Sequence, residues 1–589
     1  MKSRTTAFSL FLALSIQLSL AGPVPAQQAA DAIAPESATG VAVPGQAVLA
    51  KRQMVVAANP IAAQAGLEVL DAGGSAADAL VAVQIMLGLV EPQSSGLGGG
   101  AFLVWYDAET AEVTTFDARE TAPGAATSGL FLDAGGKPLD FFTAVIGGRS
   151  VGVPGVVRLM ETVHGRYGKL EWPSLFTAAA ELAENGFVIS PRLAALIEGS
   201  AEVLGVQPST RAYFMDADSK PLQAGSLLRN PAYAATLQTI AAAGADAFYS
   251  GPIAEGIVAA VKDHPTNPGQ ISSADLSGYV VKERKPVCAP YREFEVCGMG
   301  PPSSGALAVG QILGMVSGFD LAALGAEDPE SWRILGDATR LAFADRERYV
   351  ADSDFVTIPK GLLNPDYLAA RAQLLRRPTA LGKDDVAAGD PPWDRAELRV
   401  DGATLELPST THVVIVDSAG NVASMTSSIE TAFGAHLMSG GFLLNNQLTD
   451  FSFRPDRDGS AVANRVEPGK RPRSSMSPTI VLRDGRPAYA LGSPGGSNII
   501  PYVAKTLVAL IDWDLDMQAA IALPHLTNRF STYDLEAGTT AETMAKDLEA
   551  LGFKVAIREQ NSGLHGVAFT PDGLAGGADP RREGVALGD

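Results

Sequence analysis

The chain has 589 residues, of which 46% are hydrophobic and 19% are charged. This globular composition excludes wholesale disorder and fibrous repeats. A formal net charge of −20 and a pI of about 4.8 argue against nucleic acid as a main partner, because phosphate backbones bind basic surfaces. With two cysteines, the chain has neither a framework of several disulfides nor a cysteine-rich zinc module.

The first 26 residues have the order of a secretory signal. Lys2 and Arg4 precede an apolar stretch at residues 7–20, and small residues follow up to Ala26. The stretch is too short and too polar for a membrane helix, and no later segment has the roughly 18 apolar residues that a span requires. We therefore expect cleavage near Ala26 and a soluble, periplasmic or secreted mature protein.

Helices and a strand follow a weakly patterned lead-in that we expect to be flexible up to about Ala50. Apolar spacing predicts a helix over residues 59–73. Residues 75–78 have the pattern of a capping box that opens an apolar helix to about Val90, and residues 101–106 are typical of a buried strand. Glycines at residues 96–100 lie between that helix and that strand. A dinucleotide-binding fingerprint requires the order strand, glycines, helix, and here the order is reversed, so we interpret the glycines as a tight turn.

The middle of the chain, residues 154–375, has mainly helical patterns, the clearest at 329–349. Cys288 and Cys297 flank an alternating segment that predicts a hairpin. In an oxidising compartment a disulfide across this hairpin is chemically reasonable, but two free buried thiols fit the spacing equally well.

An exposed loop is expected over residues 377–409, where regular patterns stop. Residues 411–417 and 422–426 then predict two strands joined by a turn, and a second hairpin is expected at 480–491.

A second glycine-rich loop, residues 492–497, follows a predicted strand and precedes a predicted helix at 498–511. Backbone N–H groups in this position can bind an anion or a developing oxyanion, although a simple turn with a helix cap has the same pattern. Leu491 stands where the Gly-x-Ser-x-Gly motif requires its first glycine, which disfavours a nucleophile elbow.

Seven features, in one order along the chain, give the sequence a resemblance to a known family. They are the loop-to-strand junction Thr410-Thr411-His412 and the segments 117–123 (DARETAP), 301–305 (PPSSG), 443–447 (LLNNQ), 450–452 (DFS), 471–479 (RPRSSMSPT) and 492–496 (GSPGG). Together the chain resembles the γ-glutamyltransferase family of N-terminal-nucleophile hydrolases from about residue 50 to its end.

The resemblance implies a precursor that cleaves itself between Ser409 and Thr410. The products would be a large chain, residues 27–409, and a small chain, residues 410–589, which remain together as a heterodimer. It also implies an α/β fold in the form of a four-layer αββα sandwich built jointly by both pieces.

The implied chemistry begins with Thr410. A threonine hydroxyl needs a base, and cleavage would supply one as the free α-amine of Thr410, whose ordinary pKa is about 7.7–8.0. The resemblance assigns Arg119, Ser474 and Ser475 to a substrate α-carboxylate, Gln447 and Asp450 to its α-ammonium, Gly495 and Gly496 to the oxyanion, and Ser428 to support of the nucleophile. Taken alone, Arg119 could equally pair locally with Asp117 or Glu120, and Asp450 could be a surface carboxylate.

The expected reaction is cleavage of a γ-glutamyl amide, with glutathione as the family's usual donor. Thr410 forms a γ-glutamyl ester, and the γ-glutamyl group then passes to water or to an amino-acid amine. The predicted site contains no metal and no cofactor, and the resemblance makes His412 a structural neighbour of Thr410 and not a base.

Two departures from the family pattern bear on specificity. Glu430 stands where bacterial members often have asparagine, so it could pair with the substrate ammonium or reshape the pocket. The segment 451–474 is shorter than in members with a lid over the donor, which favours hydrolysis over transfer. A shorter segment leaves the site more open, and an open site also suits an alternative function, an acylase on this scaffold that acts on glutaryl cephalosporins or other amides.

Two further classes of protein fit the sequence less well. A penicillin-recognising serine enzyme needs Ser-x-x-Lys, which the sequence lacks. A non-catalytic solute-binding protein does not explain a threonine at a loop-to-strand junction together with the acyl-site motifs.

Overall fold

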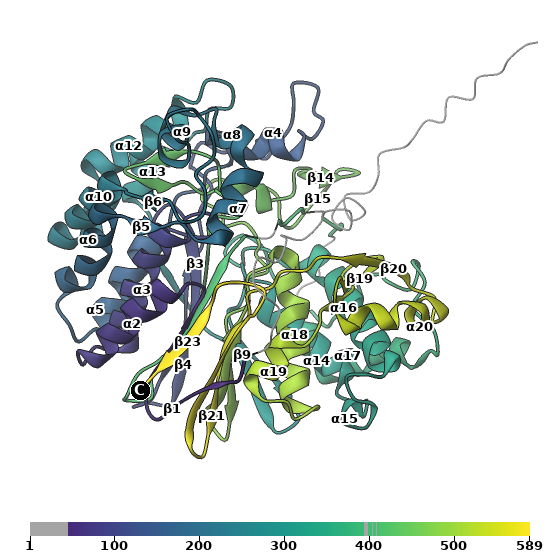
Figure 1. Cartoon of the computed structure of the whole chain (residues 1–589). Coiled ribbons are helices and arrows are strands. Elements are labelled where there is room, and N and C mark those ends of the chain that lie inside the picture. The colour runs from purple at the N-terminus through teal and green to yellow at the C-terminus, as the bar shows by residue number, and fades with distance from the viewer. Residues whose placement is uncertain (1–44, 394–398, 403, 408) are drawn as a thin grey trace, which may run out of the picture.

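Figure 1 shows a computed structural model of the chain, which describes residues 45–393, 399–402, 404–407 and 409–589. The predicted signal, residues 1–26, lies outside the described residues. Two seven-stranded sheets lie at the centre, and all neighbouring strands within each are antiparallel. The molecule thus has a mixed α/β fold with two antiparallel sheets flanked by helices.

The first sheet has, in spatial order, β23 (Val585–Gly588), β2 (Met54–Ala57), β10 (Thr411–Val416), β11 (Val422–Ser428), β3 (Gly100–Asp107), β4 (Glu112–Ala118) and β7 (Lys282–Arg284). The second sheet has β1 (Val48–Ala50), β22 (Gly573–Ala578), β21 (His565–Thr570), β17 (Arg486–Gly492), β16 (Thr479–Arg483), β9 (Phe294–Gly298) and β8 (Val287–Tyr291).

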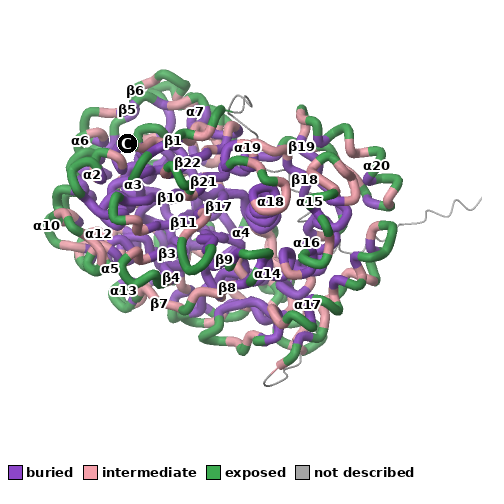
Figure 2. The backbone as a smooth tube through the Cα atoms, turned by 90° about the horizontal axis from the view of Figure 1, so that it is seen from below, coloured by how far each residue is buried: buried purple, intermediate pink, exposed green. Residues whose placement is uncertain are grey.

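The sheets pack face to face through the alternation of side chains along their strands. In β10, Val414 and Val416 join the core between the sheets, whereas Val413 and Ile415 pack against helices on the outer face. Because successive strand residues point to opposite faces, one continuous apolar strand can contribute to both cores. Figure 2 shows buried residues concentrated along these central strands and exposed residues at the periphery.

Helices cover the outer face of each sheet (Figure 1). The first sheet is covered by α2 (Pro60–Asp71), α3 (Ala76–Val90), α5 (Val156–Tyr167), α6 (Thr177–Asn185), α7 (Pro191–Gly199), α8 (Ala201–Leu204), α9 (Pro208–Phe214), α10 (Pro231–Ala243), α11 (Asp246–Tyr249), α12 (Gly251–Lys262) and α13 (Ser273–Ser277). The second is covered by α14 (Gly305–Val316), α15 (Leu321–Leu324), α16 (Pro329–Tyr349), α17 (Pro365–Ala372), α18 (Ile499–Ile511), α19 (Met517–Ala522) and α20 (Ala545–Ala550).

Smaller elements complete the fold. They are α4 (Phe141–Val145), the pairs β5 (Phe187–Val188) with β6 (Leu227–Leu228), β12 (Met438–Ser439) with β13 (Phe442–Leu443) and β14 (Asp456–Arg457) with β15 (Ser460–Ala461), and a three-stranded sheet of β18 (Leu526–Thr527), β19 (Thr532–Glu536) and β20 (Lys554–Arg558). Among the described residues, no helix combines the length and apolar character needed to cross a membrane.

Several local predictions are confirmed. Ser75 and Asp78 form the capping box of α3, which ends at Val90 as expected. Cys288 and Cys297 face each other across the β8–β9 hairpin and form a disulfide.

One local prediction is wrong. Residues 48–50 are not a flexible lead-in but form β1, which pairs with residues 574–576 of β22. This pairing joins segments more than 500 residues apart, so no local sequence pattern could reveal it.

Candidate functional site

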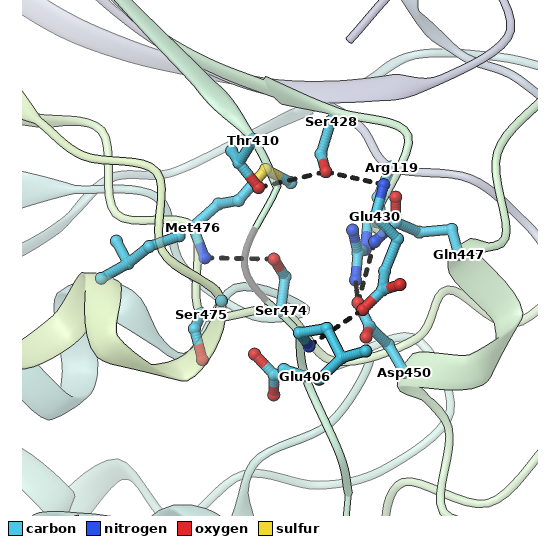
Figure 3. Close-up of a pocket in the computed structure, with 13 residues that line it drawn as sticks. Arg119, Glu406, Thr410, Ser428, Glu430, Gln447, Asp450, Ser474, Ser475 and Met476 are labelled. Carbon is cyan, nitrogen blue, oxygen red and sulfur yellow. Dashed lines mark hydrogen bonds and ion pairs between the residues drawn. The ribbon is translucent and has the colours of Figure 1, made fainter. Parts of the chain in front are cut away.

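A small pocket lies beside the start of β10. It is lined by Arg119, Glu406, Leu407, Thr410, Ser428, Glu430, Gln447, Asp450, Ser474, Ser475, Met476, Gly496 and Ile499. The fold therefore brings nine of the ten predicted catalytic and substrate-binding residues to one place, and only Gly495 is not part of the lining (Figure 3).

Strand pairing places Thr410 opposite Ser428. The β10–β11 register pairs Thr411 with Ser427, so the residue before β10 meets the last residue of β11. Figure 3 shows the two hydroxyls turned toward each other, and Thr410 Oγ1 lies 3.2 Å from Ser428 Oγ.

The carbonyl of Ser409 is surrounded by hydroxyl groups. Thr410 Oγ1 donates to this oxygen at 2.7 Å, and Ser428 Oγ donates to it at 3.0 Å. The backbone N–H of Glu430 in turn donates to Ser428 Oγ at 2.8 Å, which fixes that hydroxyl. The peptide bond before Thr410 therefore has a hydroxyl beside its carbonyl and a second donor to the oxygen that would gain negative charge in an attack.

Arg119 and Asp450 are buried and form an ion pair. The guanidinium also donates to the carbonyls of Pro472 and Arg473, both at 3.1 Å. Its Nη1 lies 3.8 Å from Glu120, so the main carboxylate partner is Asp450 and not a local one. Asp450 is therefore not a surface carboxylate, and the local ion pair of Arg119 with Glu120 is present beside the shorter one with Asp450.

Three polar atoms of the pocket lining have no hydrogen-bond partner among the described residues. They are Arg119 Nη1, Asp450 Oδ1 and Gln447 Oε1. Gln447 and Asp450 both lie in the 3-10 turn Gln447–Asp450, and Gln447 Nε2 donates to Asp450 Oδ2 at 2.9 Å, which leaves the amide oxygen unused. A buried polar atom without a partner is costly, so the pocket is built for a ligand that has an acceptor for the arginine and donors for the two oxygens.

The pocket's carboxylates have shifted pKa values. Burial raises the pKa of Asp450 to about 6, even though Arg119 acts in the opposite direction. Burial raises the pKa of Glu430 well above its ordinary value, and the negative charge of Asp450 adds to this effect. Glu430 accepts from Leu407 N–H at 3.2 Å and from Asn446 Nδ2 at 2.6 Å. A cationic ligand group here would relieve the repulsion between these acids.

Ser474 and Ser475 lie next to a charged pair that sequence analysis missed. Arg346, on α16, donates to Ser475 Oγ at 2.8 Å and forms an ion pair with Glu406. Burial alone would raise the pKa of Glu406, but the guanidinium groups of Arg346 and Arg473 outweigh it and lower that pKa. In the uncleaved chain a carboxylate from residues just before Thr410 thus occupies the serine side of the pocket.

The loop at residues 492–496 has the predicted order of strand, glycines and helix, because β17 precedes it and α18 follows. Gly495 has φ 137° and Gly496 has φ 55°, conformations that L-residues with side chains rarely adopt. A Cβ on Gly496 would lie 2.7 Å from the carbonyl oxygens of both Glu406 and Leu407. The segment before Thr410 therefore lies directly against this loop.

His412 is buried and bonded away from the pocket. Its Nδ1 lies 2.8 Å from Thr426 Oγ1, and burial, together with nearby His565, lowers its pKa well below the ordinary value. A neutral ring that does not line the pocket is consistent with the predicted role as a structural neighbour.

Comparison with known proteins agrees with this geometry. The family model described as Gamma-glutamyltranspeptidase matches residues 62–589. The chain is 35% identical to the glutathione hydrolase proenzyme of Bacillus subtilis (strain 168) over 556 residues, 92% of each chain. It is 34% identical to the Acylase ACY 1 proenzyme of Pseudomonas sp. (strain SE83), over 91% of this chain and 93% of that protein.

A solved structure shares the fold. The crystal structure of cephalosporin acylase from Bacillus halodurans superposes with a TM-score of 0.81 over 94% of this chain and 99% of that one, at 24% identity. The family model and the relatives confirm the resemblance found in the sequence: the chain is an enzyme of the gamma-glutamyltranspeptidase family.

Proposed function

We propose that the chain is a precursor that cleaves its own Ser409–Thr410 bond and then acts as a γ-glutamyl hydrolase and transferase. The observation that carries this proposal is the 2.7 Å contact between Thr410 Oγ1 and the Ser409 carbonyl oxygen, with Ser428 Oγ on the same oxygen at 3.0 Å. Thr410 Oγ1 attacks the carbonyl carbon of Ser409, the C–N bond breaks, and the nitrogen takes the hydroxyl proton. Water then hydrolyses the resulting ester, which frees the Ser409 carboxylate and the Thr410 amine.

The products are the large chain, residues 27–409, and the small chain, residues 410–589. Because β10 and β11 lie in the middle of the first sheet beside β2 and β3, neither piece has a complete sheet alone. The two would remain one four-layer αββα unit of the N-terminal-nucleophile type. The signal at residues 1–26 directs the precursor to the periplasm or the exterior.

The same groups then act on the substrate. Glu406 and Leu407 leave the pocket after cleavage, since Glu406 occupies the side where Ser474 and Ser475 would bind the substrate α-carboxylate together with Arg119. Asp450, Gln447 and Glu430 take the α-ammonium. Thr410 Oγ1 attacks the γ-carbonyl, its own amine accepts the proton, and N–H groups of Gly495 and Gly496 stabilise the oxyanion.

A γ-glutamyl donor fits better than a glutaryl donor. The two differ by the α-ammonium, and the pocket has two unpartnered acceptors, Asp450 Oδ1 and Gln447 Oε1, beside a second acid, Glu430. A glutaryl group would leave these oxygens without donors. The similarity to an acylase of nearly the same length keeps the glutaryl alternative as the second candidate.

The deciding experiment compares γ-glutamyl-p-nitroanilide with glutaryl-p-nitroanilide on the cleaved enzyme. We expect kcat/KM at least about a hundredfold higher for the γ-glutamyl compound, the effect of one buried charged hydrogen bond or two neutral ones. A higher value for the glutaryl compound would assign the chain to the acylases. Because the segment 451–474 is short, glutamate should exceed transfer product at modest acceptor concentration, and a dominant transfer product would contradict the predicted preference for hydrolysis.

Ser428→Ala should slow self-cleavage about a hundredfold, because it removes a donor from the oxygen that becomes negative. Densitometry of gels over time after synthesis measures this rate. Ser427→Ala is the matched control: this buried serine is adjacent on β11, its Oγ has no partner among the described residues, and it points to the opposite sheet face. Equal cleavage rates in the two variants would remove Ser428 from the mechanism.

The pH dependence should report the ionisation of Asp450. Burial raises the pKa of this carboxylate to about 6 in the uncleaved chain, where Glu406 adds to the rise, and burial keeps the pKa above its ordinary value once Glu406 has left. The carboxylate therefore becomes neutral as the pH falls through this range, and its attraction for the ammonium is lost. For the γ-glutamyl donor, log(kcat/KM) should therefore steepen by about one slope unit below pH 6. The glutaryl donor, which has no ammonium, should lack this extra slope, and its presence with both donors would contradict the assignment.

A further inference from the structure

The turn that follows β22 reaches the nucleophile from the C-terminal end of the chain. Asp579 Oδ2 accepts from the N–H groups of Gly563 and Leu564 at 2.8 and 2.9 Å and from Ser562 Oγ. These bonds fasten the turn to the loop before β21. Arg582, three residues after Asp579, is thereby held at a fixed place beside the pocket.

Arg582 contacts Thr410 directly. Its Nη1 donates to the Thr410 carbonyl at 3.0 Å, and its Nε donates to Asn561 Oδ1 at 3.1 Å. The side chain has no solvent exposure. Gly563 leaves room for it, because a Cβ there would lie 2.7 Å from both Arg582 Cδ and Pro494 Cγ. Gly563 thus lies against both the arginine and Pro494, which belongs to the loop that contains Gly495 and Gly496.

We propose that Arg582 is a positioning residue for mature Thr410, an inference that rests on the proposed function. It would act in two ways. Its hydrogen bond fixes the Thr410 main chain and thereby the direction of Oγ1. Its permanent positive charge disfavours protonation of the new α-amine, so that more of the amine is in the free form that can accept a proton at neutral pH.

The distance between Arg582 and the Thr410 amine is short enough for the positive charge to lower the pKa of the amine. The nitrogen and carbonyl oxygen of one residue lie within about 3.7 Å, so the Thr410 amine must lie within about 7 Å of Arg582 Nη1. A unit charge at that range shifts a pKa by roughly one to two units at an effective dielectric constant of about 20. The Thr410 carbonyl persists after cleavage, because the broken bond is on the other side of the residue.

The surrounding charges leave a positive balance near the amine. On the arginine side, Glu91 lies 4.0 Å from Arg582 Nη1 and 3.5 Å from Arg192 Nε. Burial lowers the pKa of His565 to about 4, so it is neutral, and His412 is neutral as well.

Further charges in this region are paired. Asp579 is balanced by Arg581. On the pocket side, Asp450 pairs with Arg119, Arg346 retains Glu347 as a partner after Glu406 has left, and Glu430 has a strongly raised pKa. Arg582 therefore remains a major positive influence on the amine.

The test uses the full-length chain with Arg582→Met, Arg582→Lys and Arg192→Met. The readouts are the rate of self-cleavage and the pH profile of kcat for γ-glutamyl-p-nitroanilide at saturating concentration. At saturation Asp450 is paired with the bound substrate, so the fall of kcat at acidic pH, the acidic limb of the profile, reports protonation of the Thr410 amine. Arg582→Met should move this limb up by about one pH unit and lower the plateau kcat about tenfold, with KM within about twofold. Arg582→Lys keeps the charge, so the limb should stay in place while the plateau falls.

Arg192→Met is the matched control, because Arg192 is a buried arginine on α7 that faces the same Glu91. Its plateau kcat should stay within about twofold of wild type. If Arg582→Met is folded but uncut while Arg192→Met is cut, this result supports the positioning role at the cleavage step. The effect on the plateau kcat is then measured with Arg582→Lys alone. A cleaved, active wild type with an unchanged limb and plateau in both Arg582 variants would overturn the inference but leave the proposed function intact. A wild type without a Thr410 N-terminus would instead refute the proposed function itself.

Discussion

Thr410→Ala is expected to give one uncut chain with activity reduced by at least about a thousandfold, the scale of loss when an enzyme loses its nucleophile. Wild type should instead give two bands, of roughly two-thirds and one-third of the mature length. The substitution removes both the hydroxyl that lies 2.7 Å from the Ser409 carbonyl oxygen and the group that would carry the acyl ester. Denaturing gels of purified protein and a γ-glutamyl-p-nitroanilide assay measure the two effects.

The adjacent residue offers a matched control. Thr411 is buried, starts β10, and has a hydroxyl without a hydrogen-bond partner among the described residues. Thr411→Ala should therefore still be cut and active, and Thr410→Ser, which retains a hydroxyl, should also be cut. Normal cleavage of Thr410→Ala would show that another group breaks the bond.

Asp450→Asn should lower kcat/KM for γ-glutamyl-p-nitroanilide by about a hundredfold to a thousandfold, mainly through KM. The variant leaves the substrate ammonium and Arg119 without their buried countercharge, and removing one partner of a buried pair costs about 3–5 kcal/mol. Part of this cost should appear as a lower melting temperature, since Arg119 loses its main ion-pair partner in the empty enzyme as well.

The choice of donor separates binding from folding in this variant. Glutaryl-p-nitroanilide has no ammonium, so Asp450→Asn should affect it at least about tenfold less than the γ-glutamyl compound. Asp456→Asn, on the exposed strand β14, is the control and should behave as wild type. Equal losses with both donors would reduce Asp450 to a structural partner of Arg119.

Local signals predicted much of the fold because their physical causes are local. The capping box at Ser75, the helix at 329–349 and the hairpin turns depend on residues within a few positions of each other. The pairing of β1 with β22 and the stacking of two sheets depend on contacts between distant segments, for which a single sequence contains no periodic signal.

The pocket was predicted through family motifs, and its additional residues lie outside them. Glu406 belongs to the irregular segment before Thr410, and nothing in its neighbourhood indicated that it reaches Ser475 and Arg346. Arg346 is one of several charged residues in α16, whose role becomes visible only when the helix packs beside Ser304 and Ser475. Arg582 is 172 positions from Thr410, and only the turn fixed by Asp579 brings them together.

Intact-mass measurement and N-terminal sequencing of the purified, active enzyme test the central claim most directly. We predict a small chain that begins with an unmodified Thr410, in amounts that rise in parallel with γ-glutamyl hydrolysis. Full activity in protein whose Ser409–Thr410 bond is still intact would contradict the account.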